Sequence, residues 1–120
     1  MNNSNASCDL ETALDQFLRA YVDRPDLIAH QKGWSPSIEL RATDSAAMVS
    51  VLFVDGRAQA VHGTVASPTL IVSSDERTLC DVLSLKLSPN EPYLFGELTV
   101  RGPEADFVRL DYIASELCPQ

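Results

Sequence analysis

Hydrophobic residues recur with two different periods along the chain, and the change of period separates helices from strands. Over residues 9–22 they recur every three to four positions, which is the spacing of one face of a helix. This apolar face consists of Leu10, Leu14, Phe17, Leu18, Tyr21 and Val22. Pro25 ends the helix and allows one further short helical turn before Gly33. Trp34 then follows in a loop.

From Ser37 the period changes to two, which is the period of a strand. Three apolar residues, Ile38, Leu40 and Ala42, alternate there with the polar residues Glu39, Arg41 and Thr43. Such alternation predicts a strand with one face on a core and the other in water. The nearly continuous apolar run Met48–Val54 predicts a central strand. Asp55 and Gly56 then predict a hairpin turn into a third strand, Arg57–His62.

The second half of the chain begins with a short β-branched run at residues 69–72, which predicts a fourth strand. Ser73 and Glu76 have the spacing of a capping box, so a helix is expected to open there and to end before Pro89. Its apolar stripe comprises Leu79, Val82, Leu83 and Leu87. A strand bracketed by Gly96 and Gly102 follows, and Pro103 opens a last helix. The apolar face of that helix comprises Phe107, Leu110, Ile113, Ala114 and Leu117.

The length of 120 residues is that of one ordinary domain with a single core. The polar residues at the start of the chain predict a disordered tail over residues 1–8, so the domain is expected to span residues 9–118. No apolar run approaches the roughly 20 residues that a membrane-spanning helix needs, so stable membrane insertion is not expected. The absence of a signal-peptide pattern favours a cytoplasmic protein.

The net charge of −8 repels phosphate backbones and anionic lipid surfaces, so nucleic acid is not an expected partner. The three cysteines, Cys8, Cys80 and Cys118, are far apart and odd in number. They fit neither a disulfide framework nor a paired zinc motif, and reduced thiols are expected. Cys80 lies in a helical stripe, where a small buried hydrophobic residue explains it best.

Catalytic chemistry has no recognisable motif in this sequence. The nucleophile elbow, the zinc-binding helix and the phosphate-binding glycine loop are all missing, so no cofactor is expected. Two histidines are present: His30 is expected to be solvated, and His62 to end a strand in a structural role. The acidic groups at Asp75 and Glu104 are explained by charge at helix N-termini. A small enzyme using His62 is therefore the last-ranked hypothesis.

The large apolar residues are spread over all the predicted layers, from Phe17 on the first helix to Phe107 on the last. Two interpretations remain open at this point. Such residues most often fill a close-packed core. They can also line a ligand site, because ligand sites are mostly apolar with few polar groups.

The hairpin at Asp55 and Gly56, the run 68–73, the helix carrying Leu79 and Leu83, and the glycine-bracketed segment 96–102 resemble the sterol carrier protein type two family. The resemblance covers about residues 37–117. It implies an α+β fold, a five-stranded mixed sheet with helices covering one face, and an apolar tunnel between the layers. One departure is the sequence Leu85-Lys86-Leu87 where members of the family often have a glycine, which implies a differently shaped tunnel mouth.

By this resemblance the protein would bind, and could transfer, a sterol, a fatty acid, an acyl-CoA or another lipid without enzymatic chemistry. The inward residues that fit such a tunnel are Phe17, Tyr21, Val51, Phe53, Leu79, Leu83, Tyr93, Leu94, Phe107 and Leu110. The alternative is a non-catalytic interaction or dimerisation module, including a homodimer, of a lipid- or thiol-metabolising enzyme system.

Overall fold

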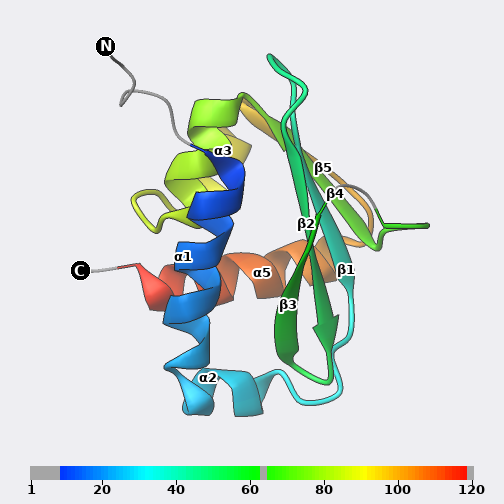
Figure 1. The fold of residues 1–120 in the computed structure, drawn as a ribbon, viewed down its shortest axis with the longest axis vertical. Helices are drawn as coiled ribbons and strands as arrows, with labels where there is room; N and C mark the ends of the chain where they lie inside the picture. Colours follow the sequence, from blue (N-terminus) through cyan, green and yellow to red (C-terminus); the bar gives the residue numbers. More distant parts are fainter. Residues whose placement is uncertain (1–8, 63–64, 119–120) are drawn as a thin grey trace.

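A five-stranded sheet and a layer of helices on one of its faces make up the protein (Figure 1). The structure is a computed structural model that describes residues 9–62 and 65–118, so the tail predicted at residues 1–8 lies outside the described residues. The strands are β1 (Ser37–Ala42), β2 (Met48–Val54), β3 (Arg57–His62), β4 (Leu70–Ser74) and β5 (Leu98–Arg101). The helices are α1 (Leu10–Val22), α2 (Pro25–His30), α3 (Glu76–Leu83), α4 (Asn90–Leu94) and α5 (Glu104–Leu117).

The strand order is β3-β2-β1-β4-β5, in which only β1 and β4 are parallel. The predicted hairpin is confirmed, since Asp55 and Gly56 both adopt positive φ and join β2 to the antiparallel β3. The strand between the two glycines, β5, pairs with β4 at the edge of the sheet. The α+β class and the five-stranded mixed sheet are therefore as predicted.

The core lies between the sheet and the helix layer that Figure 1 shows, and its residues come mainly from alternate positions of the strands and from α1, α3 and α5. On β2 these are Val49, Val51 and Phe53, all fully buried. The residues of β1 that share this face are Ile38, Leu40 and Ala42, as their alternation predicted.

The other face of β1 is not wholly in water, so the prediction for Glu39 is wrong. Glu39 is only 1% exposed, although none of the described helices covers this face. Its strand lies between β2 and β4, and its cross-strand neighbours are Ser50 and Ile71. The Arg41 side chain makes an ion pair and a hydrogen bond with the Glu39 carboxylate. Side chains of β1, β2 and β4 thus bury the Glu39 carboxylate, which the alternating pattern predicted to lie in solvent.

Three boundaries in the second half differ from the predictions. Strand β4 continues through Ser74, so the cap of α3 is Asp75 and not Ser73. Helix α3 ends at Leu83, because Leu85 turns the chain with a φ of +68°. The short helix α4 follows Pro89, where no helix was expected.

The cap of α3 provides a test of this local structure. The Asp75 carboxylate accepts hydrogen bonds from the Thr78 backbone N–H and hydroxyl at 2.9 and 2.8 Å. These bonds lower the pKa of Asp75. Asp75→Ala is expected to reduce the free energy of unfolding at pH 7 by about 1 kcal/mol. Denaturant unfolding of the two proteins measures this difference.

The pH dependence of that difference follows from the direction of the pKa shift. Because the folded-state pKa is lowered, the carboxylate stabilises the fold above the unfolded pKa of about 4. Its contribution is lost as the pH falls through the folded-state value, so the two proteins should converge in acid. Asp75→Asn keeps a capping side chain and serves as the control. A difference that stayed constant down to pH 2.5 would contradict this account.

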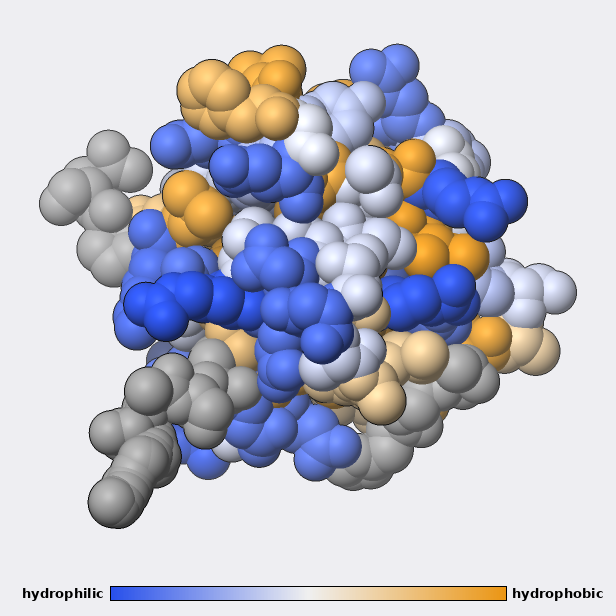
Figure 2. Space-filling view, turned by 90° about the horizontal axis from the view of Figure 1, so that it is seen from above, coloured by the Kyte–Doolittle hydropathy of each residue, from blue (hydrophilic) through white to orange (hydrophobic). Residues whose placement is uncertain are grey.

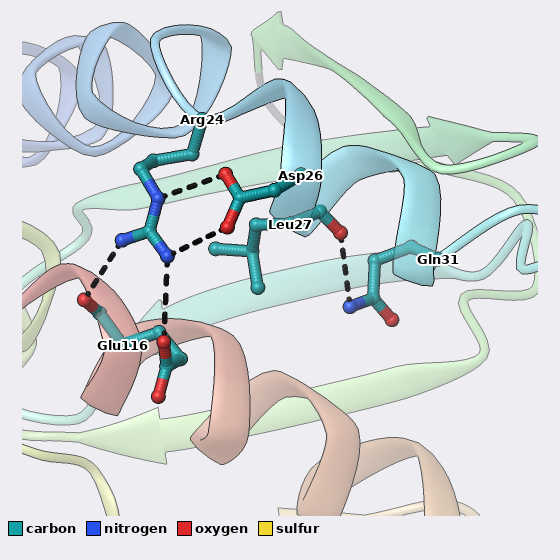
Figure 3. A network of polar contacts seen from close by, with 5 residues as sticks. All are labelled: Arg24, Asp26, Leu27, Gln31 and Glu116. Atoms are coloured by element: carbon teal, nitrogen blue, oxygen red, sulfur yellow. Dashed lines mark hydrogen bonds and ion pairs between the residues drawn. The ribbon is translucent and has the colours of Figure 1, made fainter.

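Polar contacts at the other end of the molecule fasten α2 to α5 (Figure 3). The Arg24 guanidinium donates to both oxygens of Asp26 at 3.0 Å and reaches the carbonyl and carboxylate of Glu116 at 3.3 and 3.4 Å. Gln31 donates to the carbonyl of Leu27 at 3.3 Å. The Arg24–Glu116 contacts hold the two helices together although they are some 90 residues apart in the chain.

Candidate functional site

An apolar cavity lies between the sheet and the helices α1, α3 and α5. Each of its walls comes from a different element: Phe17 from α1, Val51 from β2, Leu79 and Leu83 from α3, and Phe107 from α5. The side chains around it are those of hydrophobic residues throughout. Such a lining can hold an apolar molecule but offers no group for proton transfer or metal binding.

The cavity is small, with a volume of about 20 Å³. That is little more than the space of one water molecule, whereas sites for drug-sized ligands have roughly 300–1,000 Å³. The side chains of the three helices and the sheet therefore nearly fill it. A lipid could occupy this space only if the helices and the sheet moved apart, and an open tunnel stays a prediction.

Six of the ten predicted site residues meet at this cavity. They are Phe17, Val51, Leu79, Leu83, Phe107 and Leu110. The lining also includes residues that the prediction left out: Leu14, Ile38, Leu40, Val72, Val82, Pro89 and Ala114. Most of these share the strand alternation or helical stripes already recognised, so the signal was present. Pro89 lies between two helices and had no such signal.

Tyr21 and Phe53 are buried as expected, but they lie outside the cavity lining. Their rings meet edge to face with centroids 5.8 Å apart, and the Trp34 ring also packs on Phe53 with centroids 4.7 Å apart. The Tyr21 hydroxyl donates a 2.6 Å hydrogen bond to the Gly56 carbonyl, and burial raises the pKa of Tyr21 to about 12. This cluster fixes the β2–β3 hairpin against α1, which is a structural role.

The remaining two predicted residues belong to α4. The Tyr93 ring packs on the Phe107 ring with centroids 4.8 Å apart, so Tyr93 backs the cavity wall from outside. Leu94 is 71% exposed. The inward position predicted for Leu94 is therefore wrong, because the short helix α4 turns this side chain away from the core.

Chemically reactive groups do not gather at the cavity. Over residues 9–62 and 65–118, no group of three His, Cys, Asp or Glu side chains could hold a metal ion. The side chain of His62, which the last-ranked hypothesis used, is outside the described part of the chain. None of the described helices is long and apolar enough to cross a membrane.

Of the two cysteines among the described residues, Cys80 differs from the prediction. Cys80 is disulfide-bonded, so the reduced thiol expected there is wrong. Cys118 is a free cysteine whose pKa is raised by burial and by the nearby charge of Asp111. The cytoplasmic location stays a prediction.

No protein-family model matches the sequence, and no curated protein matches it significantly. Solved structures do match it. The sterol carrier protein domain 2 of Helicoverpa armigera superposes with a TM-score of 0.64 at 11% identity, covering 100% of this chain and 96% of the other. The UbiJ-SCP2 ubiquinone synthesis protein has a TM-score of 0.62 at 14% identity, covering 89% and 90%.

A third structure, of palmitated SCP2L2 from Aedes aegypti, has a TM-score of 0.58 at 12% identity and covers 83% of this chain and 92% of the other. Identities this low carry information on the fold alone. The agreement extends over almost the whole domain in each case, with the same kind of mixed sheet and helix layer. The chain therefore has the fold of the sterol carrier protein 2 domains.

Proposed function

We propose that this protein binds an apolar lipid between its sheet and its helix layer and carries it without chemical change. The observation that carries the proposal is the cavity itself, whose hydrophobic lining is contributed by every layer of the fold. The palmitated SCP2L2 protein has the same fold. A fatty acid is therefore a reasonable first ligand, with sterols, acyl-CoA and other lipids as further members of the class.

The driving force for such binding would be the removal of apolar surface from water, at about 25 cal/mol per Å². The opposing term is the separation of side chains that now fill the cavity. The ligand would replace contacts among the six predicted lining residues with contacts to its own chain. Neither a cofactor nor a covalent step is needed for this exchange.

Co-purified lipid tests the proposal directly. Native mass spectrometry of the purified protein should show a bound lipid, which organic extraction then identifies. A fluorescent fatty acid should also bind and be displaced by an unlabelled one. Protein that is consistently empty and gives no fluorescence response would overturn the proposal.

A substitution in the cavity should weaken that binding. Leu110→Gln places an amide in the apolar lining, where a polar group without a partner costs about 1–3 kcal/mol. The dissociation constant for the fluorescent fatty acid is therefore expected to rise about 5- to 150-fold. Val108→Gln is the matched control, because Val108 lies on the same helix but is exposed. Equal binding by both variants would exclude ligand from the α5 side of the cavity.

A second function, the non-catalytic module of an enzyme system, has one observation in its favour. The UbiJ-SCP2 protein of the same fold is a ubiquinone synthesis protein. Under this alternative the chain would form a homodimer or a stable complex with an enzyme. Size-exclusion chromatography with light scattering, alone and with co-expressed neighbouring enzymes, tests it. A strict monomer that retains no enzyme would rule it out.

A further inference from the structure

Two consecutive large hydrophobic residues at the end of α4 are almost fully in solvent. Leu94 is 71% exposed and the next residue, Phe95, is 75% exposed. Figure 2 shows several groups of hydrophobic side chains set among hydrophilic ones on one face of the molecule. Two such residues side by side form a small exposed hydrophobic patch, and the largest patch of this kind on a protein surface is often functional.

The same segment also forms part of the cavity wall. Pro89, which lines the cavity, directly precedes α4. Tyr93, which precedes Leu94, packs its ring on Phe107, another lining residue. One short stretch of chain therefore has the cavity on its inner side and two exposed hydrophobic residues on its outer side.

The connection from α3 to this segment is held in an uncommon backbone conformation. Leu85 has a φ of +68°, in the left-handed region that residues with a Cβ rarely adopt. The Lys86 N–H donates to the Asp81 carbonyl at 2.8 Å and closes the end of α3. The Leu85 side chain packs against the core. Movement at this turn would shift α4 and the Pro89 side of the cavity together.

We propose that Leu94 and Phe95 insert into the surface of a lipid bilayer, and that the apolar ligand passes between bilayer and cavity beside α4. This proposal rests on the proposed lipid-binding function. It deepens that function by assigning the surface through which the ligand is exchanged. Tyr93 would then lie at the level of the lipid headgroups, where a ring with a polar end is favoured.

The size of the patch favours a bilayer over a protein partner. An aromatic side chain has roughly 150–250 Å² of surface, so Leu94, Phe95 and the partly exposed Tyr93 offer only a few hundred Å². A stable protein interface needs about 800 Å² from each partner. A bilayer has no such minimum, because the strength of attachment scales with the apolar area inserted, and a patch of this size would give weak, reversible attachment.

The charge around Leu94 and Phe95 indicates which headgroup charge the bilayer should carry. Glu91 and Glu97 flank these two residues and are both exposed, and the chain as a whole carries a net charge of −8. Anionic headgroups would be repelled. The surface that fits is therefore a neutral, zwitterionic one.

Flotation with phosphatidylcholine vesicles tests the proposal. The wild-type protein should float with them, and the double variant Leu94→Ser/Phe95→Ser should partition at least tenfold less. The matched control is Val22→Ser/Val54→Ser, which removes two exposed hydrophobic residues elsewhere and should bind like wild type. Vesicles containing 30% phosphatidylglycerol should bind the wild-type protein more weakly.

Binding of a fluorescent fatty acid without vesicles separates this proposal from the proposed function. The Leu94→Ser/Phe95→Ser variant should bind the probe with wild-type affinity but receive it from vesicles at least tenfold more slowly. If wild type floats and no protein binds the probe, the docking surface stands and the lipid-binding function fails. The bilayer proposal is overturned if the variant floats as well as the wild-type protein does. It is also overturned if the wild-type protein never floats and the substitutions instead dissociate a dimer.

Discussion

Replacing Gly102 by alanine is expected to lower the free energy of unfolding by about 3–5 kcal/mol, which is a large fraction of the stability of a small domain. Gly102 directly follows β5 and has a φ of +128°, a conformation that residues with a Cβ rarely adopt. A Cβ placed there would lie 2.3 Å from the Thr69 carbonyl oxygen and 2.9 Å from a methyl carbon of Leu70. The carbonyl belongs to the backbone beside β4, so it cannot move without disturbing the strand pair.

The other glycine of this segment is the matched control. Gly96 also has a positive φ, of +78°, but a Cβ there would meet no atom within 4 Å. Gly96→Ala is expected to lower the free energy of unfolding by only about 1 kcal/mol, because it adds backbone strain without a steric clash. Denaturant unfolding followed by the fluorescence of Trp34, the single tryptophan, compares the two variants. If both variants lost similar amounts of unfolding free energy, the close approach of Thr69 to Gly102 would not contribute to the effect.

These two glycines illustrate what could be predicted from the sequence. Their spacing around an alternating run indicated a strand between two turns, and β5 lies there. The change of hydrophobic period at Ser37 located the first strand, and the apolar run Met48–Val54 located a central one. Local patterns of this kind depend on neighbours in the sequence. The crowding at Gly102 depends on Thr69, 33 residues earlier, and left no local signal.

The segment between α3 and β5 could not be predicted for the same reason. The apolar stripe of α3 could continue to Leu87, but the chain turns at Leu85 because its side chain packs on the core in a left-handed backbone conformation. Helix α4 has five residues, too few for a periodic pattern. Without that pattern, Leu94 looked like a core residue. Its exposure is visible only in three dimensions.

Part of the cavity lining could be predicted from the same local patterns, whereas the ligand-binding role of these residues stays a prediction. Phe17 and Leu83 were found because helical stripes indicate an inward face, and that face proved to line the cavity. Tyr21 and Phe53 also face inward but meet Trp34 and Gly56 instead. Periodicity indicates burial, but it does not distinguish the part of the core that surrounds a cavity from the part that is fully packed.

Glu39 and Arg41 provide the second large expected effect. Arg41→Ala would leave the Glu39 carboxylate, 1% exposed, without the side chain that hydrogen-bonds it in the described structure. A buried charge that loses its partner costs about 3 kcal/mol or more. We expect the free energy of unfolding at pH 7 to fall by about this amount, although Arg41 itself is half exposed. Denaturant unfolding measures the change.

The double variant Glu39→Gln/Arg41→Ala identifies the cause. If the loss comes from the unpartnered charge, removing that charge should restore most of the stability, and the two substitutions should be strongly non-additive. Arg19→Ala removes an arginine from the exposed ion pair with Asp15 on α1 and should cost less than 1 kcal/mol. Should the double variant be as unstable as Arg41→Ala, the stabilising contribution of Arg41 would come from the packing of its aliphatic stem on β1 and not from its charge.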